Sequence, residues 1–285
     1  MQKKSYLLRS VVYVMLLTAV CLTSFAVAQR TSSKSNGEPA GVTTPSSTPT
    51  PVPCQFQVLI VYSDAGPPTQ FQTEIQAEAG VTAVDLFDAS NATPTLGQLQ
   101  QYDIVVPFSD TPFFNPDTLG DNLADYVDGG GIVVQYGFSF AGPGDLAGIT
   151  GRWLTDGYNP YDYSEDLETN PFSLGAFEAG HPLMAGVTAL NSIFANIVAT
   201  NPAATEVAQN NLGESLIAFR PVGTHTTVGV TAYVGGAATQ SGDWGKVVVN
   251  AGRWLNCQGT PSPTPTPTPR ATPTPRPRPT PHPRP

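Results

Sequence analysis

Between residues 57 and 136, short apolar runs alternate with amphipathic stretches. The apolar runs predict β-strands at 57–62, 81–87, 104–108 and 132–136. Their apolarity is continuous, which is typical of strands covered on both faces, as in a parallel sheet. The stretches between them predict helices at 69–79, 96–100 and 116–127. This rhythm of strands and helices predicts an α/β fold with a doubly wound, mostly parallel sheet and right-handed crossovers.

The pattern weakens after Gly137. Residues 141–190 are rich in Gly, Pro, Asn, Asp and Tyr, and they predict a long excursion with little regular structure. Apolar runs then return and predict strands at 192–198, 206–208, 216–220, 226–233 and 247–250. A last helical turn is expected at 251–255. Strands that follow one another without long crossovers predict an antiparallel extension on one edge of the sheet.

The first 28 residues have the order of a secretory signal peptide. Two lysines and an arginine are followed by an uncharged stretch over 11–28, and residues 26–28 (AVA) form a small-x-small cleavage site. We expect cleavage before Gln29, and an uncleaved membrane anchor is the alternative. The chain is therefore expected to be secreted, or to be held in the cell envelope.

Two low-complexity segments flank the expected folded region, residues 54–257. Residues 29–53 are rich in Ser, Thr and Pro and predict a flexible linker. Residues 258–285 are rich in Pro, Thr and Arg, and proline at this density favours a disordered or polyproline II tail. We interpret the tail as a spacer in the cell envelope; the alternative is that its arginines hold an anionic wall polymer.

Removal of the signal peptide leaves two cysteines, Cys54 and Cys257, at the two ends of the folded region. In an oxidising compartment, thiols so placed predict a disulfide that joins the ends of the domain. Closing a loop of about 200 residues stabilises a domain by about 4–5 kcal/mol in the chain-entropy model. Two free buried thiols are the alternative.

Charge narrows the choice of partners. The chain has 13 basic and 22 acidic residues and a net charge of −9. Between Cys54 and Cys257 there are 21 acidic and 4 basic residues, so the folded region carries −17. Because such a surface repels phosphate backbones and anionic lipids, we expect the folded region to bind neither nucleic acid nor a membrane.

Five segments occur in an order that resembles a known family. They are 103–107 (DIVVP), 123–134 (LADYVDGGGIVV), 180–187 (GHPLMAGV), 216–220 (LIAFR) and 245–249 (GKVVV). Together they resemble the class I glutamine amidotransferase-like fold, including its ThuA-like relatives. The resemblance spans residues 56–256 and implies a flavodoxin-like, three-layer arrangement in which the last two segments are closing strands. The whole chain also resembles secreted bacterial surface proteins that carry such a domain between low-complexity tails.

The resemblance implies where an amidotransferase would hold its catalytic cysteine, in a turn after a central strand. The corresponding turn, 135–140 (QYGFSF), has no Cys, so we expect no cysteine-based acyl transfer. A serine-type site would use Ser139, with His181 or His225 as its base. However, Ala141 stands where the second glycine of Gly-x-Ser-x-Gly belongs. The simpler interpretation is a structural serine, a histidine that anchors a loop and a histidine at a strand edge.

Polar residues directly follow three of the predicted strands. They are Ser63, Asp64, Ser109, Asp110 and Ser139. Because ligands of open α/β sheets bind outside the carboxyl ends of the strands, these residues predict a site for a polyol or sugar. Ca²⁺ held by Asp64 and Asp110 is a further prediction, and the alternative is that the two aspartates cap turns or helices. The histidine spacing matches no transition-metal site, so no other metal and no cofactor are expected.

These observations favour a secreted or envelope-associated, non-catalytic α/β domain. It is expected to bind or display an extracellular ligand such as a glycan or a cell-wall polymer. One alternative is an extracellular hydrolase of ThuA-like or serine type that acts on a saccharide or an ester. A second alternative is a purely structural surface protein.

Overall fold

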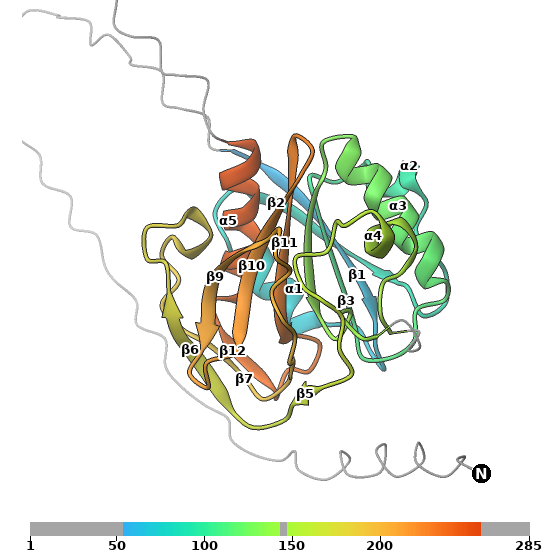
Figure 1. Ribbon diagram of the computed structural model, residues 1–285. Coiled ribbons are helices and arrows are strands. Elements are labelled where there is room, and N and C mark those ends of the chain that lie inside the picture. Colours follow the sequence, from blue (N-terminus) through green and yellow to red (C-terminus); the bar gives the residue numbers. More distant parts are fainter. Residues whose placement is uncertain (1–53, 143–146, 258–285) are drawn as a thin grey trace, which may run out of the picture. The chain divides into compact units, whose positions relative to one another are not determined.

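The computed structural model describes residues 54–142 and 147–257 (Figure 1). The predictions of a signal peptide (1–28), a linker (29–53) and a proline-rich tail (258–285) lie outside the described residues. Within the described ranges, no helix is long and apolar enough to cross a membrane.

The first half of the domain is built on parallel strands. Its elements are β1 (Phe56–Ser63), α1 (Thr69–Gln76), β2 (Val81–Asp88), α2 (Leu96–Leu99), β3 (Ile104–Ser109), α3 (Pro116–Asp128) and β4 (Ile132–Gly137). Strand β1 pairs in parallel with β2 and β3, and β3 pairs in parallel with β4. The four strands and three helices predicted here are confirmed, with differences only at their ends.

Helix α3 shows how local sequence sets the bounds of an element. Asn115 precedes the helix, and its side-chain oxygen accepts a hydrogen bond of 3.0 Å from the amide of Thr118. Pro116 takes the first helical position, where no amide hydrogen is needed. Leu119 and Leu123 are buried on the face that packs on the sheet. The helix then ends at a run of three glycines that starts at residue 129.

The second half adds mainly antiparallel strands. Its elements are α4 (Gly151–Thr155), β5 (Leu167–Glu168), β6 (Phe172–Phe177), a 3₁₀ turn (Pro182–Met184), β7 (Leu190–Ser192), β8 (Ala195–Asn196), β9 (Thr205–Asn210), β10 (Ser215–Val222), β11 (His225–Tyr233), β12 (Gln240–Gly242) and α5 (Trp244–Asn256). Strand β11 pairs in parallel with β4 and antiparallel with β10, which pairs antiparallel with β9. The 12-stranded sheet is therefore mixed rather than mostly parallel.

The prediction of a strand at 247–250 is wrong, and so is the placement of 245–249 in a closing strand. Both segments belong to helix α5. Trp244, Val247, Val248 and Ala251 are buried, with the spacing of one helical face. Contact of this face with the sheet outweighs the β-propensity of the three consecutive valines.

Two hydrophobic clusters cover opposite faces of the sheet. On β1, Val58 and Ile60 belong to the cluster that includes α1 and α5. Leu59 and Val61 belong to the cluster that includes α3 and the buried Trp153 of α4. Because successive side chains of a strand point to opposite faces, β1 is covered on both sides, as its continuous apolarity predicts.

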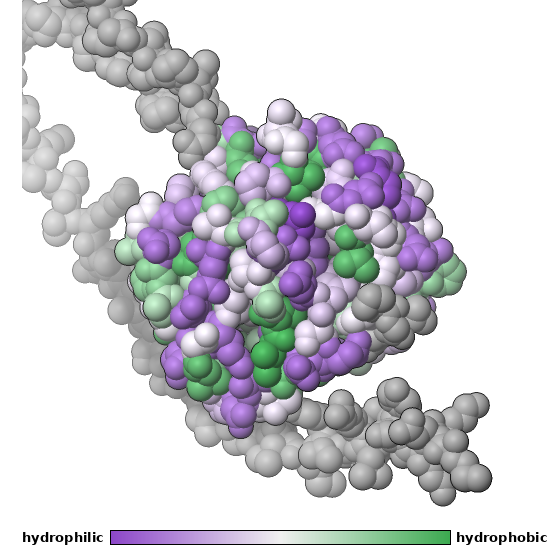
Figure 2. Space-filling model, in the orientation of Figure 1, coloured by the Kyte–Doolittle hydropathy of each residue, from purple (hydrophilic) through white to green (hydrophobic). Residues whose placement is uncertain are grey.

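Hydrophobic side chains at the surface form separate patches. On the face shown in Figure 2, green areas are divided by hydrophilic side chains, and a larger one lies in the lower middle of the view. The large hydrophobic residues that are exposed come from different elements and loops, and they are Phe114, Leu167, Phe177, Ile197 and Leu212. Scattered apolar residues are normal on a folded domain.

A disulfide joins Cys54 to Cys257, which confirms that prediction. The two Cα atoms are 6.2 Å apart, although the residues are separated by 203 positions. Cys54 precedes β1 and Cys257 follows α5, so the bond ties the first strand of the domain to its last helix. This junction lies at the edge where the parallel strands begin, which we call the amino edge.

We expect the double variant Cys54→Ser, Cys257→Ser to lose up to about 5 kcal/mol of unfolding free energy, because the unfolded chain is no longer closed into a loop. Urea unfolding followed by circular dichroism measures the loss. The wild-type domain with its disulfide reduced is the matched control and is expected to lose a similar amount. An unchanged midpoint in the double variant would show that the bond does not stabilise the fold.

Candidate functional site

The ends of four parallel strands meet at one edge of the sheet, which we call the carboxyl edge. Asp64 follows β1, Asp110 follows β3 and Phe138 follows β4, while Tyr233 ends β11. Strand register places the last residue of β1 beside the last residue of β3, and Gly137 of β4 beside Tyr233. The two predicted aspartates therefore lie at the predicted edge, and the structure adds Phe138 and Tyr233 to them.

The three serines predicted to bind a ligand are buried, and their hydroxyl groups are used within the protein. Ser63 donates to the carbonyl oxygen of Pro112 (2.8 Å), and Ser109 donates to that of Ala147 (2.8 Å). Ser139 donates to a carbonyl oxygen within its own turn. All three have 0% exposure. These hydroxyls hold the loops after the strands and do not face solvent.

The structure does not bring Ser139 together with His181. Ser139 follows the carboxyl end of β4, whereas the ring of His181 contacts Trp254 in the last turn of α5. That turn adjoins Cys257 and thus the amino edge. The Nδ1 atom of His181 accepts a hydrogen bond of 3.2 Å from the amide of Leu183, so this histidine caps the 3₁₀ turn.

His225 is also remote from Ser139. It begins β11 and pairs with Val222 of β10, whereas the other end of β11 lies beside Gly137. Strand β11 has nine residues, so its two ends are about 26 Å apart. Both histidines therefore lie toward the amino edge, at the other end of the sheet from the serine.

Asp64 and Tyr233 form the polar centre of the carboxyl edge. The Tyr233 hydroxyl donates a hydrogen bond of 2.5 Å to Oδ2 of Asp64, and the amide of Ala65 donates one of 2.6 Å to Oδ1. Gly235 leaves room for this pair, because a Cβ atom there would stand 2.0 Å from Oδ2 of Asp64. The pair links the ends of β1 and β11, which are 169 residues apart.

Burial governs the protonation of this edge. It raises the pKa of Asp64, and the hydrogen bonds from Tyr233 and Ala65 oppose that shift only in part. Burial and the negative charge of Asp64 raise the pKa of Asp110. Burial and the bond to Asp64 raise the pKa of the Tyr233 hydroxyl, which therefore keeps its proton and acts as a donor. The two aspartates are thus close enough to influence each other.

Aromatic rings adjoin the Asp64–Tyr233 pair. Phe138 stacks on Tyr233 with ring centroids 5.1 Å apart and an angle of 3° between the planes. Phe194 meets both rings edge to face, at 6.2 Å from Phe138 and 6.4 Å from Tyr233. Phe138 and Phe194 are half-buried, so part of this aromatic surface is open to solvent beside a carboxylate.

Metal binding at this edge stays a prediction. Among the described residues there is no group of three or more His, Cys, Asp or Glu side chains that could hold a metal ion. Asp64 and Asp110 offer two carboxylates, whereas Ca²⁺ takes six to eight oxygen ligands. Any further oxygens would have to come from backbone, water or the ligand itself.

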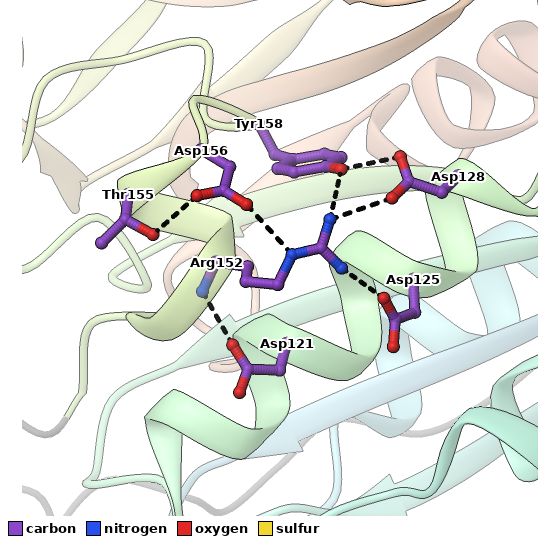
Figure 3. A network of polar contacts seen from close by, with 7 residues as sticks. All are labelled: Asp121, Asp125, Asp128, Arg152, Thr155, Asp156 and Tyr158. Atoms are coloured by element: carbon purple, nitrogen blue, oxygen red, sulfur yellow. Dashed lines mark hydrogen bonds and ion pairs between the residues drawn. The ribbon is translucent and has the colours of Figure 1, made fainter.

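The excursion after β4 is anchored to helix α3 through Arg152 (Figure 3). Its guanidinium group contacts the carboxylate of Asp125, and it lies 3.0 Å from an oxygen of Asp128 and 3.0 Å from one of Asp156. It also donates to the Tyr158 hydroxyl, which donates to Asp128. The bonds to Asp128 and Asp156 raise the pKa of Arg152. These aspartates are therefore paired within the protein.

Comparison with known proteins identifies the fold. No family model matches the chain, and no curated protein matches it. Two cytoplasmic proteins from Salmonella typhimurium have similar structures. One is 16% identical and covers 70% of this chain and 98% of its own, with a TM-score of 0.51. The other is 15% identical and covers 70% and 97%, with a TM-score of 0.50.

A protein from Bacteroides uniformis described as ThuA-like is 13% identical and covers 79% of this chain and 97% of its own, with a TM-score of 0.49. Identities this low carry no information about activity. The domain shares the α/β fold of the two Salmonella proteins.

The raised pKa of Asp64 predicts how the variant Asp64→Asn behaves. The pKa of Asp64 is higher in the folded than in the unfolded protein, so ionisation of this carboxyl group lowers the free energy of unfolding. This loss of stability reaches its full size once the pH exceeds the pKa of the folded state. Asparagine removes this charge and keeps an oxygen for Tyr233, but its side-chain amide nitrogen cannot accept the hydrogen bond that the amide of Ala65 donates to Oδ1. We therefore expect the variant to gain stability relative to wild type as the pH rises from about 3 to 7, whatever the cost of the lost bond at low pH. Thermal unfolding across this range tests the sign, and a variant that loses stability relative to wild type as the pH rises contradicts it.

Arg152→Lys tests the anchoring of the excursion. A single ammonium group cannot bridge three carboxylates, so we expect a loss of up to about 1 kcal/mol of unfolding free energy. Added salt should reduce the difference in unfolding free energy between the variant and wild type, because salt screens the repulsion among the aspartates. Arg253→Lys is the matched control, since Arg253 bonds to uncharged oxygens of Asn250 and Ala79. An equal loss in both variants rules out a special role for Arg152.

Proposed function

We propose that this chain is a secreted or envelope-associated, non-catalytic domain that binds or displays an extracellular ligand, with the carboxyl edge as its binding surface. The observation that carries the proposal is the bonded Asp64–Tyr233 pair beside the half-buried ring of Phe138. A carboxylate accepts hydrogen bonds from hydroxyl groups, and an aromatic face packs against C–H groups. A glycan presents both kinds of group.

The chemistry of the site supports binding rather than hydrolysis. Both described cysteines are in the disulfide, so neither is a nucleophile. The Ser139 hydroxyl is buried and bonded to a carbonyl oxygen. Within the described residues, no contact joins it to a histidine that could take its proton. The alternative of a saccharide or ester hydrolase would require this loop to rearrange.

We also propose that the fold is of the doubly wound, amidotransferase-like and ThuA-like type. Five neighbouring strands run parallel in the order β2-β1-β3-β4-β11, and hydrophobic clusters with helices cover both faces. The order of the motifs between 103 and 220 supports this assignment. The helical conformation of 245–249 departs from it, because that segment was matched to a strand.

Two features support the proposal of export. One is the signal-like pattern of the first 28 residues, and the other is the disulfide, a bond that persists mainly in oxidising compartments. The two similar Salmonella proteins are described as cytoplasmic, but at their identity the likeness concerns the fold alone. We propose that the proline-rich tail spaces the domain from the cell wall.

Ligand binding is tested with the full chain on a glycan array, followed by calorimetry with the best binder. We expect Asp64→Asn and Phe138→Ala each to weaken binding at least about tenfold, which corresponds to 1.4 kcal/mol. Glu178→Gln is the matched control, because it removes one exposed carboxylate near His181. It is expected to bind as wild type does.

Each other outcome separates the alternatives. Equal binding by all variants would show that the ligand binds at a surface other than the carboxyl edge. Binding to no glycan and no wall polymer favours a structural role. Turnover of an ester or glycoside that Ser139→Ala abolishes establishes the hydrolase.

A further inference from the structure

Three aromatic rings meet on a surface remote from the carboxyl edge. His181 stacks on Phe219 with centroids 5.2 Å apart, and Trp254 meets His181 at 4.7 Å and Phe219 at 5.0 Å. We call these three residues the aromatic cluster. All three are half-buried, so part of each side chain is accessible to solvent. The other two tryptophans, Trp153 and Trp244, have 0% exposure.

The three rings of the aromatic cluster are uncharged at neutral pH. Burial lowers the pKa of His181, and the carboxylate of Glu178 opposes this shift only in part. A neutral imidazole ring between a phenyl and an indole ring behaves as part of an apolar surface. Flat aromatic surfaces of this kind are what proline-rich segments dock against, because the proline rings pack on the aromatic faces.

The position of the cluster points to one occupant. Trp254 lies three residues before Cys257, about 4.5 Å along the helix axis. The chain continues from Cys257 into the tail, 258–285, which lies outside the described residues. In its sequence, every second residue from 261 to 269 is proline. The disulfide fixes Cys257, the residue from which the tail continues, within one helical turn of Trp254 in sequence.

We propose that the proline-rich segment 260–269 packs against the aromatic cluster of its own chain. Residues 258–260 connect Cys257 to the proline run, and three residues can span at most about 10 Å, which is more than the rise of about 4.5 Å along the helix axis between Trp254 and Cys257. Glycine, which stands at 259, tolerates the backbone conformations that a reversal of the chain requires. A polyproline segment is already extended, so little conformational entropy is lost when it docks.

Charge and tethering both favour this contact. Arg270 directly follows the proline run, and the folded region between the cysteines carries −17. The acidic domain therefore attracts the basic tail. A short tether holds the segment at an effective concentration in the millimolar range, so even a weak interaction is populated. This inference is independent of the ligand proposed for the carboxyl edge.

Acrylamide quenching of tryptophan fluorescence in the full chain tests the proposal. Trp153 and Trp244 are buried, so quenching reports mainly on Trp254. A proximal variant replaces three prolines of the docked segment by serine, and a matched distal variant replaces three prolines near the end of the tail. The substitutions are Pro261→Ser, Pro263→Ser and Pro265→Ser in the first, and Pro279→Ser, Pro281→Ser and Pro283→Ser in the second.

We expect the quenching constant to rise about twofold in the proximal variant. This rise corresponds to a tail that shields Trp254 about half of the time in wild type and no longer docks in the variant. The distal variant is expected to match wild type. Near-ultraviolet circular dichroism checks that the fold is unchanged. The proposal is overturned if the proximal variant quenches like wild type, or if both variants change equally. It is also overturned if the protection of Trp254 from acrylamide depends on protein concentration, because the docked segment then comes from a second copy of the chain.

Discussion

Strand β11 holds the two halves of the sheet together, because it pairs in parallel with β4 and antiparallel with β10. Its seven residues from Thr227 to Tyr233 are all buried. The parallel pairing places Tyr233 beside Gly137, and from there its hydroxyl group reaches Asp64 at the end of β1. The candidate site is thus a direct consequence of the order of strands in the sheet.

The acidic groups of the domain fall into two kinds. Asp128 and Asp156 have lowered pKa values, because they accept hydrogen bonds from Tyr158 and Arg152, so their charges stabilise the fold. Asp64 has a raised pKa because burial disfavours its charged form, and the pKa of Asp110 is raised by partial desolvation together with the negative charge of Asp64. Carboxylates with perturbed pKa values occur often at functional sites. This contrast supports the carboxyl edge, rather than the paired aspartates around Arg152, as the binding surface.

Much of the fold follows from local sequence, whereas the details of the site do not. The continuous apolar run 57–62 and the capped start of α3 carry their own structural signals. The valines of 247–249 favour a strand by propensity, and only their spacing with Trp244 reveals the helix. Ser63 lies at the predicted edge, but its hydroxyl points inward, a direction that no sequence pattern reveals. Tyr233 becomes part of the site only through a partner 169 residues away.

We propose that the ligand binds where β1, β3, β4 and β11 end. Amide chemical shifts of the isotopically labelled full chain, recorded while a soluble wall oligosaccharide is added, test it most directly. We expect saturable shifts at residues 64–65, 110–111, 137–138 and 233–235, with none at 222–225. Shifts confined to the amino edge, or spread evenly over the α3 surface, contradict it.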